Sequence, residues 1–256
     1  MDMNETLVII PTYNECGNVR PLGEAVFRVC PDVDLLFVDD DSPDGTGGIL
    51  DGMAAADPRI HVLHREGKAG LGRAYIAGFD WAMQRDYRFV FEMDADFSHR
   101  PQDLPVLRDA ALQADLVLGS RYLAGIRVMN WPLSRLILSK TAAYYVRVIT
   151  GMPFKDPTGG FKCYRREVLE AIPFARIHST GYSFQIETTH EAWMNGFRVL
   201  EVPIVFEERR SGSSKLDMSV MLETVWRVWK LWFRWRCRRR PRQRHASSVG
   251  PQGKWD

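Results

Sequence analysis

Four short runs of apolar residues in the first half of the chain most strongly constrain its fold. They span residues 7–10, 35–38, 89–91 and 116–118. Uninterrupted runs of this length are typical of strands buried on both faces, as in a parallel sheet. Helix-like segments separate or follow them, at Asn18–Arg28, Gly47–Ala56, Gly70–Met83 and Gln102–Ala114. This alternation predicts an α/β fold, in which a mostly parallel sheet carries helices on both faces.

The second half of the chain is less regular. Residues Ser134–Thr150 and Glu187–Asn195 suit helices, and Val199–Phe206 suits a strand. A Pro- and Gly-rich stretch at 156–160 interrupts the pattern between them. We find no internal repeat and no Gly/Ser linker, so 256 residues favour one large domain, which we expect to span residues 1–220.

Acidic residues directly follow two of the four apolar runs. Asp39–Asp41 comes after the second run, and Asp94-Ala95-Asp96 comes after the third. Because ligands bind at the carboxyl ends of strands in such sheets, these acids should converge with Tyr13–Glu15, which follows the first run. Carboxylates suit Mg²⁺ or Mn²⁺, whose ligands are often completed by substrate phosphates. The alternatives are a solvated acidic turn at 94–96 and an Asx turn with a helix cap at Thr46.

Other residues near these strand ends suit a nucleotide. Tyr13 can pack on a nucleobase and Glu15 can accept hydrogen bonds from it, although Asn14 and Glu15 can equally begin the next helix. The segment Lys68–Gly72 fits neither common phosphate-loop pattern. We interpret it as a closely packed turn before a helix, from which Lys68 can still reach a phosphate.

Basic residues in the second half suit an anionic ligand. Arg135 and Ser139 are four residues apart on one predicted helix face, and Arg121 follows the fourth apolar run. Two guanidinium groups and a hydroxyl can clamp a phosphate monoester. The loop Arg209–Lys215 can close over a diphosphate, or it can be a mobile surface loop.

Eight motifs together resemble a known family. They are PTYNE, VDDDSPDGT, KAGLGRAY, MDADFSHRP, GSRY, DPTGGFKCYRR, GYSFQIE and SGSSKL, in this order between Thr6 and Leu216. The series resembles family-2 glycosyltransferases of the Rossmann-like GT-A fold, and it is most similar to dolichol- or polyprenol-phosphate mannose synthases.

The resemblance implies an activity and assigns site residues. The expected reaction transfers mannose from GDP-mannose to a polyprenyl or dolichyl monophosphate with inversion, which gives β-mannosyl phosphoprenol. The implied donor site consists of Pro11, Tyr13, Glu15, Val38, Asp40, Asp94, Ala95, Asp96, Arg209 and Lys215. The implied ligands of Mg²⁺ or Mn²⁺ are Asp94, Asp96 and Ser98, and the implied acceptor-phosphate site is Arg121, Arg135 and Ser139. The implied catalytic residues are Asp96, Arg121, Arg209 and Lys215.

The acceptor's chemistry has a consequence for catalysis. A phosphate monoester has its second pKa near ~6, so it is already largely dianionic at neutral pH. We therefore expect positioning and electrostatics to carry the reaction without a strong general base. A UDP-glucose donor is an alternative, and so is a catalytically silent nucleotide-sugar-binding scaffold.

The C-terminal region is strongly basic and aromatic. Residues 224–256 contain ten Lys and Arg and one acidic residue, a net +9, which leaves the rest with 24 − 31 = −7. Trp226, Trp229, Trp232 and Trp235 alternate with these cations. We expect a basic amphipathic helix at 221–245 that lies on an anionic membrane surface, followed by a disordered tail at 246–256.

The same composition bears on partners and location. A basic aromatic tail also suits nucleic acid, but a lipid acceptor favours a membrane. No run reaches the roughly 18 apolar residues of a spanning helix, and four scattered cysteines fit a reducing compartment. We expect a peripheral protein on the cytoplasmic face of a membrane.

Overall fold

A computed structural model describes residues 5–177, 179, 181–208, 226 and 228–233. The helices of this part are α1 Val19–Val29, α2 Thr46–Ala56, α3 Leu71–Met83, α4 Leu104–Ala111, α5 Leu133–Thr150, α6 Arg166–Ala171 and α7 Tyr182–Met194. Short 3₁₀ turns lie at Pro101–Asp103 and Phe174–Arg176. None of the helices in the described ranges has the length and hydrophobicity needed to cross a bilayer.

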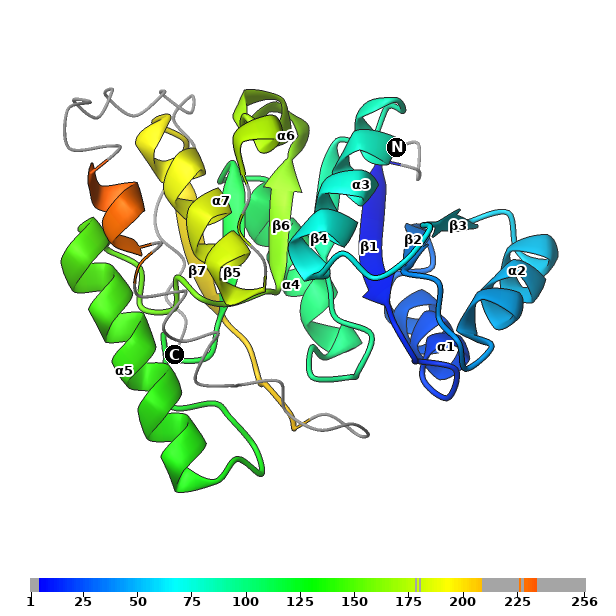
Figure 1. Ribbon diagram of the computed structural model, residues 1–256, viewed down its shortest axis with the longest axis horizontal. Coiled ribbons are helices and arrows are strands. Elements are labelled where there is room, and N and C mark those ends of the chain that lie inside the picture. Colours follow the sequence, from blue (N-terminus) through cyan, green and yellow to red (C-terminus); the bar gives the residue numbers. More distant parts are fainter. Residues whose placement is uncertain (1–4, 178, 180, 209–225, 227, 234–256) are drawn as a thin grey trace.

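One sheet of seven strands organises the described residues (Figure 1). The strands are β1 Thr6–Thr12, β2 Asp34–Asp39, β3 Ile60–His64, β4 Phe89–Glu92, β5 Leu116–Ser120, β6 Lys162–Arg165 and β7 Val199–Pro203. Their order is β3-β2-β1-β4-β6-β5-β7. Only β6 is antiparallel to its neighbours in this described sheet, so the predicted mostly parallel sheet is confirmed.

Two apolar clusters cover the two faces of the sheet. Alternate side chains of β1 enter different clusters, since Leu7 and Ile9 pack with α3, α6 and α7, whereas Val8 and Ile10 pack with α1, α2 and α4. All four side chains are fully buried. The prediction of helices on both faces is thus confirmed, and it explains why the strand cores lack polar residues.

Several element boundaries differ from those predicted. The helix expected at 102–114 begins as a 3₁₀ turn and ends at Ala111, and the strand expected to reach Phe206 ends at Pro203. Strands β3 and β6 were not predicted from the sequence. Both are short and contain polar residues, as in Ile-His-Val-Leu-His and Lys-Cys-Tyr-Arg, so their apolar signal is weak.

The expected convergence of three strand ends is confirmed. Strand β1 pairs in parallel with β2 on one side and with β4 on the other. Their carboxyl ends therefore lie at the same edge, and the loops after Thr12, Asp39 and Glu92 meet there.

Candidate active site

The loops after β1 and β2 are hydrogen-bonded to each other. The amide N–H of Glu15 donates to Thr46 Oγ1 at 3.0 Å, and that of Cys16 donates to Asp44 at 3.1 Å. Desolvation favours the neutral form of Asp44, but hydrogen bonds from Thr46 and Cys16 outweigh it and lower the pKa of Asp44 to about 2. Asp44 also forms the expected Asx turn, because it accepts from the N–H of Thr46. The interpretation of Thr46 as a helix cap is wrong, since α2 begins at Thr46 itself.

Asp39 and Asp40, the two buried aspartates that follow β2, have different partners. Asp39 accepts hydrogen bonds from Thr12 at 3.0 Å and from the Ser42 hydroxyl at 2.6 Å. Asp40 forms an ion pair with Arg65 of the loop after β3, and both side chains are largely buried. Burial raises the pKa of Asp40 more than Arg65 lowers it. The donor-site candidate Asp40 is therefore already paired with a cation that the sequence analysis did not single out.

The remaining candidates for nucleotide binding surround this pair. Pro11 and Val38 are register partners on neighbouring strands. Lys68 lies over the ring of Tyr13, with its Nζ 3.8 Å from the ring centroid. The carboxylate of Glu15 accepts a hydrogen bond of 2.7 Å from the side-chain amide that precedes α1. A flat aromatic face, a buried acid and two cations thus gather at the ends of β1 to β3.

One non-glycine residue in each of the three loops has a positive φ. These are Asn14 at 62°, Asp41 at 56° and Phe97 at 62°. A non-glycine residue in this left-handed conformation costs about 1–3 kcal/mol, and such residues concentrate at functional sites. Asn and Asp adopt the conformation more readily than Phe. Since α1 begins at Val19, the alternative that Asn14 and Glu15 start this helix is wrong.

The loop after β4 holds the two aspartates of the Asp-Ala-Asp motif. Asp94 accepts a hydrogen bond of 3.3 Å from the Tyr75 hydroxyl, and its amide N–H donates to His99 Nδ1 at 3.1 Å. Asp96 is 7% exposed and accepts from the amide N–H of Ser98 at 3.0 Å. Burial lowers the pKa of His99, so its neutral ring can accept at Nδ1. The solvated-turn interpretation of the motif is therefore wrong.

The donor atoms of this loop suit a hard divalent cation. Asp94 and Asp96 supply carboxylate oxygens, and Ser98 supplies a buried hydroxyl oxygen that has no hydrogen-bond partner among the described residues. All-oxygen ligands are those that Mg²⁺ and Mn²⁺ prefer. Within the described part of the chain, no three His, Cys, Asp or Glu side chains are grouped to hold a metal.

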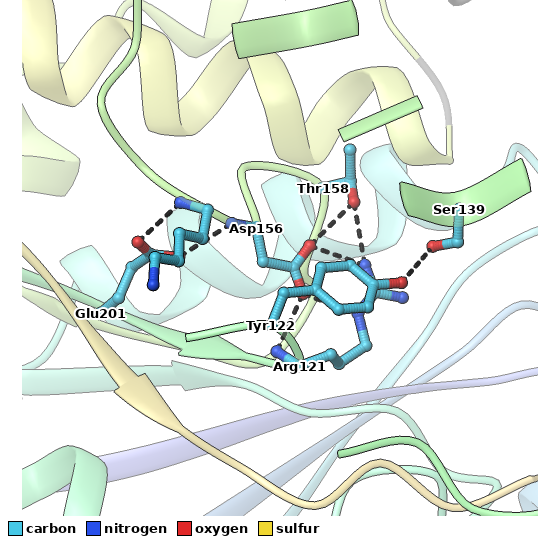
Figure 2. A network of polar contacts seen from close by, with 7 residues as sticks. Arg121, Tyr122, Ser139, Asp156, Thr158 and Glu201 are labelled. Carbon is cyan, nitrogen blue, oxygen red and sulfur yellow. Dashed lines mark hydrogen bonds and ion pairs between the residues drawn. The ribbon is translucent and has the colours of Figure 1, made fainter. Parts of the chain in front are cut away.

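Arg121 lies in a buried network at the end of β5 (Figure 2). Its guanidinium donates two hydrogen bonds of 2.7 Å to Asp156 and one of 2.9 Å to Thr158. Glu201 of β7 holds the same loop, because it accepts from the amide N–H of Asp156 at 2.8 Å. Desolvation raises the pKa of Asp156, but the charge and hydrogen bonds of Arg121 outweigh it and lower that pKa. From the sequence alone, residues 156–160 are predicted only to interrupt the pattern of helices and strands.

Arg135 and Ser139 extend from α5 toward this network. Tyr122, the neighbour of Arg121, donates a hydrogen bond of 2.8 Å to Ser139. The guanidinium carbons of Arg135 and Arg121 lie 4.1 Å and 5.8 Å from the Trp131 ring centroid. The structure thus brings the three acceptor-site candidates together around Trp131 and Tyr122.

Phe206 connects the aspartate loop to these arginines. Its ring centroid lies 5.5 Å from that of His99 and 5.4 Å from that of Trp131. The guanidinium carbon of Arg121 is 5.5 Å from the same ring. One aromatic side chain, which the sequence did not single out, therefore contacts both the predicted metal loop and the predicted acceptor site.

A buried charged pair lies beneath the aspartate loop. Glu92 of β4 and Lys162 of β6 are register partners on antiparallel strands. Burial raises the pKa of Glu92 to about 7 and lowers that of Lys162 to about 8. Lys162 Nζ donates to the Gln185 carbonyl at 2.8 Å and to Thr188 at 3.0 Å. An acidic residue inside an apolar run, two positions before Asp94, was the available signal for this pair.

Two of the predicted site residues lie outside the described residues. These are Arg209 and Lys215, the candidates for closing over the donor. Most of the expected basic helix at 221–245 also lies outside them, but residues 226 and 228–233 are helical. Val228 and Leu231 are buried in the same apolar cluster as the helices α3 and α7.

Comparison with known proteins identifies relatives over most of the chain. Residues 7–172 match the family described as "Glycosyl transferase family 2". The chain is 52% identical over 233 residues to a polyprenol monophosphomannose synthase of Mycolicibacterium smegmatis, covering 90% of this chain and 88% of the relative. It is 47% identical over 223 residues to an undecaprenyl-phosphate mannosyltransferase of Micrococcus luteus, covering 87% and 91%.

Solved structures support the same fold. A glucosyl-3-phosphoglycerate synthase from Mycobacterium tuberculosis, in complex with Mn²⁺, UDP and glucosyl-3-phosphoglycerate, superimposes with a TM-score of 0.65. The two sequences are 18% identical, and the match covers 90% of this chain and 80% of that one. At this identity the likeness concerns the fold alone. The family match over residues 7–172 and the two relatives at 52% and 47% identity show that the chain belongs to glycosyl transferase family 2.

Proposed function

We propose that this protein transfers mannose from GDP-mannose to a polyprenyl monophosphate with inversion, giving β-mannosyl phosphoprenol. The main support is the contact of Phe206 with both His99 and Trp131, because it joins the aspartate loop to the arginine-rich site. The names of the two relatives, which are 52% and 47% identical, support a mannosyl donor and a lipid-phosphate acceptor.

The donor nucleotide is proposed to bind at the ends of β1 and β2. Tyr13 would stack on the base after Lys68 moves from the ring it now covers. Asp40 and Glu15 would accept hydrogen bonds from the base or the ribose, and Pro11 and Val38 would line the pocket. Arg209 and Lys215 would supply positive charge to the departing diphosphate.

The metal is proposed to bind at the aspartate loop. Asp94, Asp96 and Ser98 would hold Mg²⁺ or Mn²⁺, with Ala95 contributing the backbone between the two carboxylates. The bound ion would neutralise negative charge on the leaving diphosphate. The Tyr75 hydroxyl donates to Asp94 at 3.3 Å, and the Ser98 amide N–H donates to Asp96 at 3.0 Å. These hydrogen bonds already orient the two carboxylates.

The acceptor phosphate is proposed to bind among Arg121, Arg135 and Ser139. Arg121 is fixed by Asp156, so its guanidinium is preorganised and needs little movement when the phosphate arrives. The phosphate is largely dianionic at neutral pH, so the site must align its oxygen with the sugar carbon rather than remove a proton. The lipid substrate implies a protein that acts at a membrane surface, which we place on the cytoplasmic face.

A transfer assay tests the proposal. The full-length protein is incubated with Mg²⁺, a short-chain prenyl phosphate and radiolabelled GDP-mannose or UDP-glucose. We expect label in the lipid fraction from GDP-mannose only, with loss of transfer on chelation and recovery with Mg²⁺ or Mn²⁺. Label from UDP-glucose alone would contradict the donor assignment. Nucleotide binding without any lipid-linked label would indicate the scaffold alternative instead.

A further inference from the structure

The exposed large hydrophobic side chains of the described residues are concentrated in two segments of the chain. Nine of the ten lie in residues 126–148 or 226–233, and the tenth is Leu112. The nine are Ile126, Met129, Leu133, Ile137, Tyr144, Val148, Trp226, Trp229 and Phe233. Scattered apolar side chains are normal on a protein surface, whereas a contiguous group of them marks an interaction site.

Helix α5 carries the first half of this group along its outer side. At about 100° per residue, its four exposed large hydrophobic side chains fall within an arc of roughly 60°. They are Leu133, Ile137, Tyr144 and Val148, between 57% and 70% exposed. Val146 points the opposite way, and both it and Ala143, which lies outside the arc, are buried. The helix therefore packs on the domain with one side and presents a mainly apolar stripe with the other.

The helical residues near 226–233 continue this surface. Val228 and Leu231 anchor them in the core, while Trp226 and Phe233 are 72% and 64% exposed. The Trp229 side chain hydrogen-bonds to Tyr145 of α5. Figure 1 shows this short helix, in orange, beside one end of the green α5. We call the exposed side chains of α5 and of residues 226–233 the α5 face.

We propose that the α5 face inserts into the interfacial layer of an anionic membrane. Tyr and Trp are the side chains that favour this layer, and the exposed cations Lys140 and Lys230 lie among them, as required for contact with anionic headgroups. The net charge of +9 on residues 224–256 also favours an anionic surface.

The position of the acceptor site favours a bilayer over any other partner for the α5 face. This step rests on the proposed function. Arg135 and Ser139 lie on the inward side of α5, opposite the apolar stripe, and Ser139 is hydrogen-bonded within the acceptor site. A helix with its side chains is only about 10 Å across. Seating the outer side of α5 among headgroups would hold the acceptor site within that distance of the phosphate of a membrane-embedded lipid.

The test is vesicle sedimentation of the full-length protein. We compare Ile137→Glu/Val148→Glu, which adds two carboxylates, with Leu112→Glu, which adds one at a side chain that is also exposed, by 56%, but lies off the α5 face. Vesicles contain phosphatidylcholine with or without phosphatidylglycerol, and high salt is included because it screens attraction from the basic tail. We expect the double variant to bind at least about tenfold more weakly than wild type at high salt, and Leu112→Glu to bind like wild type.

Turnover measurements separate this inference from the proposed function. The double variant should lose transfer to acceptor in vesicles but keep transfer to a water-soluble short-chain acceptor, with unchanged thermal unfolding. Equal vesicle binding by the double variant and wild type would overturn the inference. So would a wild-type dimer in sedimentation velocity that the double variant abolishes while vesicle binding persists, since the α5 face would then contact a second copy. Vesicle binding that depends on this face, without transfer from any donor, would instead overturn the proposed function alone.

Discussion

Replacing Asp156 with Asn should strongly destabilise the protein, because it removes the charge that neutralises Arg121. The Asp156 and Arg121 side chains are 0% and 5% exposed, and the backbone N–H of Arg121 also donates to this carboxylate at 3.0 Å. Removing one partner of a buried ion pair leaves the other charge buried and uncompensated, which costs about 3–5 kcal/mol. For a domain of this size, each kcal/mol corresponds to about 2–4 °C in Tm, so we expect a drop of roughly 6–20 °C.

Urea and thermal unfolding of the two full-length proteins measure this effect. The control is Glu170→Gln, which breaks the exposed pair between Arg166 and Glu170 on α6 and should cost about 0.5 kcal/mol or less. The pH dependence supplies a second readout. Since the folded-state pKa of Asp156 is lowered, the ion pair stabilises the protein above the unfolded pKa of about 3.9 and loses its effect as the pH falls through the folded pKa. Asp156→Asn should therefore lose least stability, relative to wild type, at the most acidic pH. An unfolding free energy within about 1 kcal/mol of wild type at pH 7 would refute this reasoning.

Three further substitutions test other parts of the site and the fold. Asp96→Ala should abolish metal-dependent transfer with little change in Tm, and unchanged turnover would remove Asp96 from the metal site. Arg65→Ala should raise the KM for the nucleotide sugar several-fold and leave the KM for prenyl phosphate unchanged, because Arg65 contacts Asp40 at the proposed donor site; a change in the acceptor KM alone would contradict this. Gly72→Ala should cost about 1–3 kcal/mol, since its Cβ would lie 2.8 Å from a backbone carbonyl oxygen, whereas Gly52→Ala in α2 has open space and should stabilise by about 0.4–1 kcal/mol. Similar unfolding curves for the two alanine variants would show that residue 72 is not closely packed.

The close contacts around Gly72 agree with the predicted closely packed turn at Lys68–Gly72. A Cβ on Gly72 would also lie 3.0 Å from the Phe184 ring of α7. The packing interpretation of this segment is confirmed at Gly72, but the partner is a helix more than 100 residues away in the sequence. The sequence indicated that the segment is tight, and only the fold identifies what it packs against.

The features that sequence alone determined are those encoded within a few consecutive residues. The continuous apolar runs at 7–10 and 35–38 predict strands buried on both faces, because any polar residue there would be desolvated without a partner. Acidic loops that follow such runs must lie at the carboxyl edge of a parallel sheet, so the placement of Asp94 and Asp96 was predictable.

Tertiary structure decided which distant residues meet. Strand β6 enters antiparallel between β4 and β5, and this pairing brings Lys162 opposite Glu92. Asp156 reaches Arg121 across 35 positions of sequence, and Phe206 contacts His99 only because the chain after β7 returns to the aspartate loop. No local pattern encodes such contacts, because they depend on strand order and on which buried charge finds a partner when the layers pack together.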